Sequence, residues 1–561
     1  MIPLTDSVPA AAIASPVITE EPPSIDYAVL SPMLVVFAAG VVAVLIEAFA
    51  PAARRHSIQL GLALASVLGA FVLTVLQVGA MPDAEAGMAP EEVAGVTTAM
   101  NSVAIDRPTL FLQGTILVLS FISLLLVAER RSGESAFAAQ AATVPGSEEE
   151  RSHVLAGSRH TEVYPLVLFA LLGMLLFPAA NDFLTMFVAL EVMSLPLYLL
   201  CGLARRRRLF SQEAAVKYFL LGAFSSAFFL FGIALVYGYA GSVNFADIHE
   251  AIETGGSTLF VGGTATPLLL VGIAMIAVGL LFKVGAVPFH NWKPDVYQGA
   301  PTPITALMAS GVLVAAFGAM LRVFLMAFGA AVADWRPMLW VVAILTMVLA
   351  AVVAVTQRDI KRLLAYSSVV HAGFVLTAVV AATPEGLAGA LFYLAAYGFT
   401  TIGAFAVITL VRTHENGPEA ADISQWAGLG RTSPLLAGAL ALFLLAFAGI
   451  PLTSGFIGKF AVFQAAVAAG ATPLVVVGVL ASAVTAFFYV RIIVLMYFAE
   501  PEGAGPSVIR AGTLTGSVIG LGVAATLLLG VYPTPVLDTL LPQPVEAALE
   551  PGMATEDGFT R

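Results

Sequence analysis

Ionisable residues inside long apolar segments are the feature of this sequence with the clearest chemical consequence. The chain has five lysines in 561 residues, and Lys217, Lys283 and Lys459 lie in or at the edge of apolar runs. Glu191 lies inside another apolar run, residues 183–203. Each such group costs at least ~2.5–3.5 kcal/mol at the centre of a bilayer, and groups this costly are usually functional. A carboxylate and several amines at membrane depth could hold and pass protons or small cations.

The composition indicates the class of protein. The chain is 59% hydrophobic and only 11% charged, whereas a soluble protein carries about 25% charged residues. Many apolar stretches exceed the roughly 20 residues that span a bilayer. We therefore predict an all-α polytopic membrane protein. The single cysteine, Cys201, excludes an internal disulfide and a multi-cysteine metal site.

About fourteen transmembrane helices are predicted, with boundaries good to a few residues. The predicted spans are 28–50, 57–79, 108–128, 162–180, 183–203, 214–239, 266–295, 302–329, 337–356, 361–381, 384–412, 434–470, 473–499 and 511–532. Most of the gaps between them are short and marked by Pro, Gly, Asn or Asp, which favour turns. The 129–161 gap is longer and polar, so we expect a surface loop there.

Spans 7 and 12 are predicted to be broken helices. Residues 266–295 contain Pro288 shortly after Lys283, and residues 434–470 contain Gly449 and Pro451. Proline removes a backbone donor and glycine lets a helix unwind. Paired interrupted helices in corresponding places indicate inverted repeats and a transport site. The breaks lie five spans apart, which predicts two inverted five-helix repeats, spans 4–8 and 9–13.

Charge asymmetry between the loops predicts the orientation. One set of loops is rich in basic residues, namely Arg54, Arg55, Arg130, Arg131, the arginine run 205–208, Arg358, Lys361, Arg362 and Arg431. The opposite set is acidic, with Asp83, Glu85, Glu91, Glu92, Asp247, Glu250 and Glu253. By the positive-inside rule the basic loops face the cytoplasm. Both termini then face outward, as an even number of spans requires.

These spans divide the chain into segments. We expect an outward-facing tail over 1–27, three N-terminal helices over 28–128, a cytoplasmic loop over 129–161, a first repeat over 162–329, a second over 337–499, a last helix over 511–532 and an outward-facing tail over 533–561. The first 27 residues contain no Lys or Arg, so they lack the basic start of a signal peptide. No soluble domain is predicted.

Glu191 and Lys217 form the first candidate proton site. Asp182 is expected in the turn before span 5, which places Glu191 about 13 Å along the helix, near the middle of the membrane. A pair of opposite charges costs less at this depth than two unpartnered charges, so we expect Glu191 to share a network with Lys217 or Lys283. Lys217 could instead snorkel or pair locally with Glu213, four residues before it.

Three further residues complete the candidate site. Lys283 immediately precedes the break in span 7 and Lys459 follows the break in span 12. A lysine can shift between its charged and neutral forms when buried, so each could gain and lose a proton in a working cycle. His371 lies inside span 10, and its imidazole suits a proton relay, although a membrane histidine is often only a hydrogen bonder. His290, at the span 7 break, is interpreted as structural.

Several segments resemble one known family. These segments are 289–303 (FHNWKPDVYQGAPTP), 359–373 (DIKRLLAYSSVVHAG) and 455–460 (GFIGKF). Together they look like the signature of the antiporter-like subunits of respiratory complex I. Residues 191–198 (EVMSLPLY) resemble the N-type subunits of that family in particular. The resemblance covers roughly residues 160–500.

The resemblance implies a proton-translocating subunit of an NADH-quinone oxidoreductase in a bacterial inner membrane. The implied partners are the other membrane subunits of complex I, including neighbouring antiporter-like subunits, and the lipid bilayer. FMN, iron–sulfur clusters and quinone are then expected in the complex, with no cofactor or metal bound by this chain and no nucleic-acid partner. The family also matches Lys217, and Lys459 resembles its terminal proton-transfer lysine.

The chain departs from the family pattern at one position in span 8. The family usually has a lysine there, whereas this chain has Leu313. The polar side chains of span 8 are Thr305, Ser310 and, near its far end, Arg322. A hydroxyl does not store a proton at neutral pH, so the connection from Lys283 toward His371 would need water.

Two other functions remain open at the level of sequence. One is a subunit of a cation/proton antiporter, because such subunits share the broken helices. The other is a structural membrane subunit that does not pump, which the residue at position 313 makes conceivable. The sequence contains no Gly-rich phosphate loop, cysteine cluster or nicotinamide-binding pattern, so redox chemistry is assigned to the whole assembly.

Overall fold

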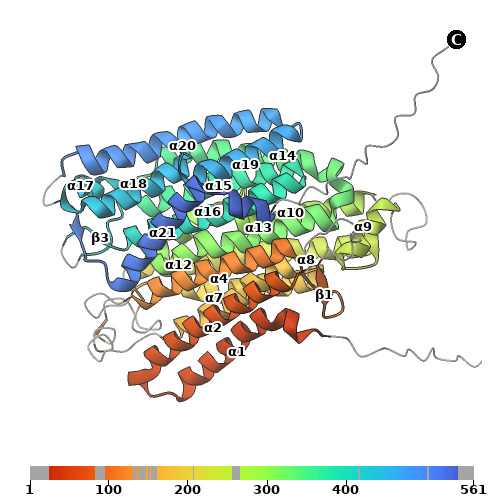
Figure 1. The fold of residues 1–561 in the computed structure, drawn as a ribbon, viewed down its shortest axis with the longest axis horizontal. Helices are drawn as coiled ribbons and strands as arrows, with labels where there is room; N and C mark the ends of the chain where they lie inside the picture. Colours follow the sequence, from red (N-terminus) through yellow and green to blue (C-terminus); the bar gives the residue numbers. More distant parts are fainter. Residues whose placement is uncertain are drawn as a thin grey trace, which may run out of the picture.

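Long helices that run roughly parallel to one another make up almost all of the structure (Figure 1). The computed structural model describes residues 25–81, 95–129, 136–137, 147–148, 152, 161–205, 207–255, 266–414, 417–501 and 505–540. Within these ranges, 12 helices are long and apolar enough to cross a membrane. The all-α polytopic membrane fold is therefore confirmed. The tails 1–24 and 541–561 and most of the loop 129–161 lie outside the described residues.

Among the described residues, three helices precede residues 160–500 and two follow them. They are α1 (Tyr27–Phe49), α2 (Ala52–Ala80), α4 (Arg107–Ala128), α21 (Thr513–Val531) and the short α22 (Thr534–Leu540). α1 packs on α2 and α6, and α21 packs on α16.

The first group of helices covers the predicted spans 4–8. It comprises α6 (Val163–Leu176), α7 (Phe183–Cys201), α8 (Arg208–Ala240), the short α9 (Phe245–Glu253), α10 (Thr266–Val284), α11 (Trp292–Gly299), α12 (Thr302–Leu307) and α13 (Leu313–Arg322). π-helical turns at Met308–Val312 and Val323–Ala327 connect α12 to α13 and follow α13. α6 is too short to count among the 12 long helices, although a 3-10 turn, Phe177–Ala179, extends it.

The second group covers the predicted spans 9–13. It comprises α14 (Val332–Val355), α15 (Ile360–Ala381), α16 (Pro384–Ile408), the short α17 (Leu429–Thr432), α18 (Pro434–Ala448), α19 (Ser454–Ala468) and α20 (Thr472–Phe498). α18 and α19 together fill the predicted span 12, and neither is long enough alone to count among the 12. The total of fourteen spans and the two-repeat interpretation stay predictions.

Both predicted helix breaks are present. α10 ends at Val284 and α11 begins at Trp292, while α18 ends at Ala448 and α19 begins at Ser454. The residue after each first half is a glycine in the left-handed region, with φ of 75° at Gly285 and 82° at Gly449. Glycine adopts this conformation without steric cost, which lets each helix end inside the bundle.

The centre of the bundle differs from its periphery. α12, α13, α15 and α16 are almost wholly buried. α1, α2, α8, α14, α20 and α21 expose many large apolar side chains, such as Leu220 and Phe487. Such an apolar surface is favourable in a bilayer, which accepts helices because they satisfy their backbone groups within the segment. The broken helices are therefore held between a buried core and a lipid-facing shell.

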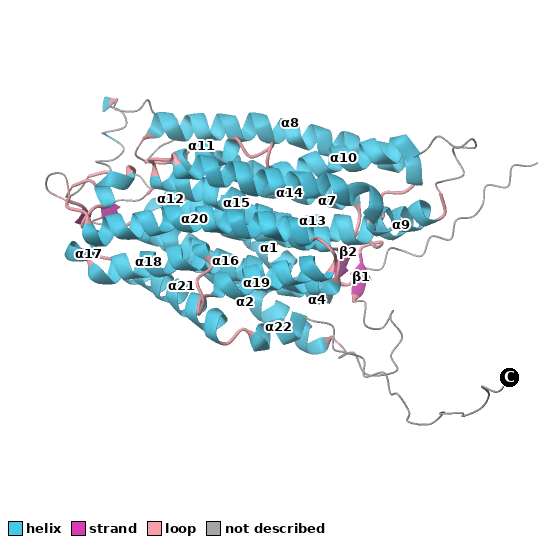
Figure 2. Ribbon diagram, turned by 90° about the horizontal axis from the view of Figure 1, so that it is seen from above, coloured by secondary structure: helices cyan, strands magenta, loops and turns pink. Residues whose placement is uncertain are grey.

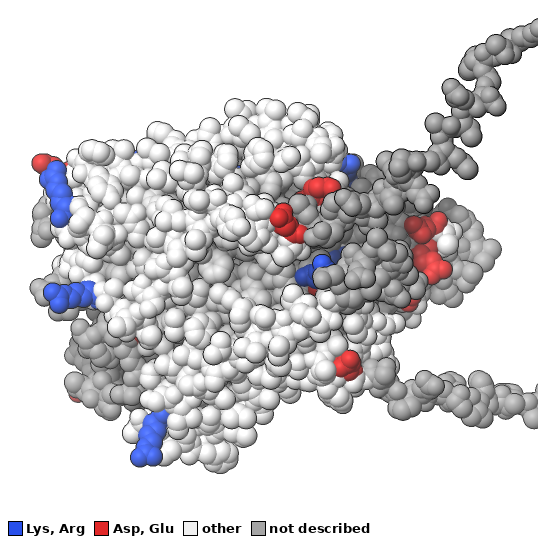
Figure 3. Space-filling model, viewed as in Figure 1, with Lys and Arg blue, Asp and Glu red and all other residues white. Residues whose placement is uncertain are grey.

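Two small antiparallel sheets lie at opposite ends of the bundle (Figures 1 and 2). β1 (Val96–Thr98) pairs with β2 (Val103–Ile105), with Thr97 opposite Ala104. β3 (Val411–Arg412) pairs with β4 (Ser507–Val508), with Val411 opposite Val508. On the face in Figure 3, Lys and Arg predominate at the β3 end, whereas most Asp and Glu, with some Lys and Arg among them, lie at the other end beyond a broad uncharged band. We call the first of these the basic end.

Candidate proton-transfer site

Glu191 lies on α7 and faces α8. Its Oε1 accepts a hydrogen bond from the Ser226 hydroxyl at 2.5 Å. The start of α7 is fixed by Asp182, whose Oδ1 accepts from the backbone N–H groups of Leu184 and Thr185 at 2.8 Å each. Asp182 is thus an N-cap in the expected turn. Glu191 thus bonds a serine directly, and its network with Lys217 or Lys283 stays a prediction.

Lys217 is drawn into a different ion-pair network. Its Nζ lies 2.7 Å from Glu213 and 2.6 Å from Asp295, and its side chain is 40% exposed. Asp295 also pairs with Arg362 at 2.5 Å. Lys217 therefore does not pair with Glu191, because Ser226 lies about 13 Å further along the same helix. The network instead links the starts of α8 and α15 to α11.

Lys283 is the amine that lies nearest to the Glu191 site. It is buried, and its Nζ donates to the Ser194 hydroxyl at 2.7 Å and to the Tyr218 hydroxyl at 3.3 Å. Ser194 lies about one turn after Glu191 on α7, so both side chains occupy one face of that helix. Glu191 acts electrostatically on Lys283. The structure therefore brings together Glu191, Ser194 and Lys283.

His371 lies in the middle of α15 and is surrounded by aromatic residues. Its Nδ1 is 2.6 Å from the Tyr393 hydroxyl and its Nε2 is 3.3 Å from the Tyr489 hydroxyl. Tyr489 also bonds the Ser367 hydroxyl. A cavity of about 10 Å³ adjoins the imidazole and is lined by Ser454 and Gly458, among others. This volume holds about one water molecule.

Lys459 lies at the second helix break, close to His371. Its Nζ donates to the carbonyls of Phe447 and Ala448 at 2.9 and 3.0 Å and to the Ser482 hydroxyl at 2.8 Å. It also lies 4.8 Å from the centroid of the Phe374 ring, and that ring is 5.6 Å from the imidazole of His371. Lys459 and His371 thus share one aromatic environment and interact electrostatically.

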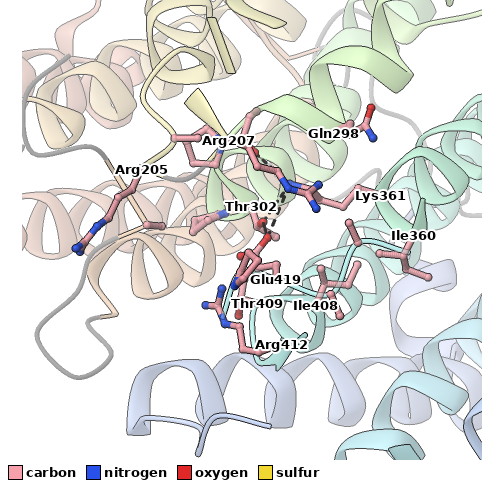
Figure 4. Close-up of a pocket in the computed structure, with 18 of the residues that line it drawn as sticks. Arg205, Arg207, Gln298, Thr302, Ile360, Lys361, Ile408, Thr409, Arg412 and Glu419 are labelled. Carbon is pink, nitrogen blue, oxygen red and sulfur yellow. Dashed lines mark hydrogen bonds and ion pairs between the residues drawn. The ribbon is translucent and has the colours of Figure 1, made fainter. Parts of the chain in front are cut away.

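A cavity of about 260 Å³ opens at the basic end (Figure 4). Lys361 lies on its wall and donates to Ala300 O at 3.2 Å and to the Thr302 hydroxyl at 3.3 Å. Glu419 accepts from Thr302 at 2.6 Å and lies 3.9 Å from Lys361. The cavity therefore brings polar and charged groups to the start of α12 and α15, two of the most buried helices.

Comparisons with known proteins agree with this architecture. Residues 180–485 match the family model described as NADH:quinone oxidoreductase/Mrp antiporter, TM. The NADH-quinone oxidoreductase subunit N of Thermobifida fusca is 74% identical over 95% of this chain and 95% of its own. The chain belongs to the subunit N family of NADH-quinone oxidoreductases.

Solved structures agree with the family. A chain in respiratory complex I from Thermus thermophilus with bound Aureothin has a TM-score of 0.71 at 30% identity, over 91% of this chain and 99% of that one. A chain in the Mrp complex from Dietzia sp. DQ12-45-1b has a TM-score of 0.72 at 22% identity, over 92% and 95%. The second likeness concerns the fold alone. The predicted identity as a membrane subunit of an NADH-quinone oxidoreductase is confirmed.

Position 313 in span 8, where the family resemblance implied a lysine, holds an apolar residue. Leu313 is the first residue of α13, directly after the π-helical turn Met308–Val312, and its side chain is buried. Ser310 donates to Ala306 O of its own helix, and Arg322 pairs with Asp106 at 2.6 Å. These two polar side chains of span 8 are therefore occupied by structural contacts away from His371.

Sequence reasoning missed Lys293 and Lys361 as buried cations. Lys293 lies within the family signature near the end of predicted span 7, but polar residues such as His290, Asn291 and Asp295 surround it in the sequence, so it does not stand out as a charge in an apolar run. Tyr393 and Tyr489 were missed because their contact with His371 depends on how α15, α16 and α20 pack together. His290 is partly buried and its ring lies 6.1 Å from that of Tyr366.

Proposed function

We propose that this chain passes protons through Glu191, Lys283, His371 and Lys459 within an NADH-quinone oxidoreductase. The observation that carries this proposal is the placement of a buried lysine at each of two helix breaks, with a hydrogen-bonded histidine close to the second. Buried lysines and histidines can change protonation within a cycle. The Glu191 carboxylate offers the electrostatic partner that Lys283 needs when it is charged.

Lys217 takes a different part in the proposal. Its amine is partly exposed and forms ion pairs with Glu213 and Asp295. Lys217 would therefore hold α11 against α8 by these ion pairs and would not itself pass protons. Changes at Lys217 would then reach Lys283 indirectly, through the position of α11.

The proposed setting is the membrane arm of complex I. The partners are its other membrane subunits, including neighbouring antiporter-like subunits, and the FMN, iron–sulfur and quinone sites of the complex are assigned to other chains. Among the described residues, the structure contains no cluster of three His, Cys, Asp or Glu side chains that could hold a metal. Electron transfer from NADH to quinone would thus drive proton movement in this chain from a distance.

The proposed orientation places the basic end in the cytoplasm and both termini outside a bacterial inner membrane. Figure 3 supports it, because basic side chains predominate at one end of an apolar band and acidic side chains at the other. The two proposed repeats are 162–329 and 337–499. Cysteine labelling of the arginine run 205–208 from outside intact cells would contradict this orientation.

The decisive test is the proton-to-electron ratio of the assembled complex in sealed vesicles. Lys459→Met and Lys283→Met should each lower proton pumping and NADH oxidation together, because the two are coupled. Phe460→Leu, on the exposed side of α19 next to Lys459, serves as the matched control. Unchanged ratios and rates in both lysine variants would leave a structural, non-pumping subunit as the function.

Glu191→Gln tests the carboxylate separately. The amide oxygen of glutamine can still accept from Ser226, so the complex should assemble normally while pumping falls several-fold. Normal pumping at normal complex abundance would remove Glu191 from the route. Loss of the complex would instead indicate a structural role for the carboxylate.

A cation/proton antiporter is the second candidate, favoured by the likeness to the Mrp chain. It predicts sodium-dependent proton movement without NADH. Sodium-driven acidification by membranes that lack the redox subunits would support it over the complex I function.

A further inference from the structure

Lys293 is the most deeply buried lysine of the described chain. It lies on α11, just after the first break, and its residue is 1% exposed. Its Nζ donates to Val284 O at 2.8 Å and to the Ser368 hydroxyl at 2.9 Å. Its stem runs beside Gly285, where an added Cβ would meet Lys293 Cδ at 2.4 Å. The amine is thus held between the end of α10 and the middle of α15, in a slot shaped around it.

Lys293 occupies the same local position as Lys459. Each first half-helix ends in a Schellman motif, in which Ala286 N–H bonds Leu281 O and Ile450 N–H bonds Leu445 O. The motif leaves the last carbonyl of each helix without a backbone partner. Lys293 Nζ takes that carbonyl at Val284, and Lys459 Nζ takes it at Ala448. Each amine also bonds one serine of a neighbouring helix.

Lys293 connects the first break to His371, which Lys283 does not. Lys283 turns toward Ser194 and Tyr218, on the Glu191 side. Ser368, the partner of Lys293, lies about one turn before His371 on α15, and such residues have Cβ atoms about 5–6 Å apart. The lysines that act electrostatically on His371 are Lys293 and Lys459, one from each break.

We propose that Lys293 is a proton-relay residue that takes the place of the amine missing from span 8. The proposal rests on the proton-transfer function proposed above. Lys293 accepts a proton from the Lys283 side as a neutral amine and becomes an ammonium. It then releases one proton through the Ser368 hydroxyl toward the imidazole of His371 and returns to the neutral amine. The route thus bypasses Leu313.

The alternative role is a helix cap, because lysines near a helix C-terminus often bond its last carbonyls. A cap does not require an ionisable group, and burying a charge without an opposite partner is costly. The Lys293 amine donates to two neutral oxygens, the Val284 carbonyl and the Ser368 hydroxyl. A cap needs only an N–H donor at this position. A relay also needs a group that can bind and release a proton, and lysine provides one.

A matched pair of variants separates the two roles. Lys293→Gln keeps an N–H donor for Val284 O but cannot bind a proton. Lys293→His has a similar size and can bind and release one. The complex is purified from native membranes, its abundance is measured, and proton-to-electron ratios are recorded in sealed vesicles. Ser368→Ala tests the next step, and Ser310→Ala, whose hydroxyl bonds only its own helix in the described contacts, is its control.

A relay predicts a several-fold fall in pumping for Lys293→Gln, partial recovery in Lys293→His, and a fall in Ser368→Ala but not in Ser310→Ala. Equal pumping in the Gln and His variants overturns the inference. If neither Lys293 variant assembles, the serine pair decides, and normal pumping in Ser368→Ala rejects the relay. Normal pumping in both Lys459→Met and Lys283→Met rejects the wider proton-transfer function, whereas a fall in those two variants with normal pumping in Lys293→Gln rejects only Lys293.

Discussion

The two broken helices end in the same way but carry different amines. α10 and α18 each close with a Schellman motif and a left-handed glycine, and each has a lysine from its second half on the last carbonyl. The first break has an additional lysine, Lys283, on its first half. The corresponding stretch of α18, Leu444–Ala448, is apolar.

The difference indicates a division of work between the breaks. The amine shared by both breaks, Lys293 or Lys459, lies in electrostatic range of His371. The amine unique to the first break lies beside Ser194 and Glu191 on the opposite side of α10. The first break therefore contacts two neighbouring sites, and the second contacts one. In the proposed route, the first break would thus join the Glu191 site to His371, whereas the second break would reach only His371.

The largest loss of pumping should come from a permanent positive charge at the second break, which has one lysine, Lys459. In Lys459→Arg the side chain stays protonated at any working pH, so proton transfer through α19 should stop. Loss of a positioned acid–base group costs on the order of 10²-fold or more, and pumping should fall accordingly. Rates of NADH oxidation and dye-reported acidification in vesicles measure this. Pumping near the normal level would show that the second break does not need to release a proton.

Restoring the family lysine to span 8 should weaken the protein rather than improve it. Leu313 is buried in a wholly helical core region. An ionised lysine there costs about 2.5–3.5 kcal/mol and adds volume to a packed site. Leu313→Lys should therefore lower the amount of assembled complex, measured on native gels. Normal abundance with increased pumping would instead show that span 8 still contains room for a relay.

The glycines at the two breaks should differ in sensitivity. Both have positive φ, for which an alanine costs roughly 1–2 kcal/mol. An added Cβ would lie 2.4 Å from Lys293 Cδ at Gly285 but 2.9 Å from Lys459 Cδ at Gly449. Gly285→Ala should thus lower the thermal midpoint of the complex more than Gly449→Ala. Gly470→Ala is the control, because its φ is +78° and no atom lies within 4 Å; equal midpoints in all three would exclude the lysine contact.

The smallest effect is expected at the surface of the first break. Lys217 is partly exposed, and ion pairs of this kind contribute about 0.2–1 kcal/mol. Lys217→Ala should shift the thermal midpoint slightly and leave pumping within about twofold of normal. The shift should shrink in high salt, because exposed charges are screened. A collapse of pumping at normal complex abundance would place Lys217 in the relay itself.

The sequence predicted the membrane fold and both helix breaks, because apolar length, proline and glycine act locally. It also offered Lys283, Lys459 and His371 as candidates, since an ionisable residue in an apolar run is visible without a structure, and their role in proton transfer stays a prediction. It did not predict that Glu191 bonds Ser226 or that Lys217 bonds Asp295. These hydrogen-bond partners depend on how far along each packed helix the residues lie, which the sequence alone does not fix. Lys293 escaped notice for the same reason, because its burial comes from α10 and α15 rather than from its own neighbours.

The cavity at the basic end bears on which ions can reach this part of the chain. Among the residues that the structure describes, four basic side chains line it, from Arg205, Arg207, Lys361 and Arg412, against two carboxylates, from Glu129 and Glu419. Glu129 also accepts the backbone N–H of Thr515 at 2.8 Å. Walls with an excess of fixed positive charge repel sodium and potassium and attract anions. A proton is carried along hydrogen bonds and needs no site for a hydrated metal ion, so this opening would act as an electrostatic filter against alkali cations.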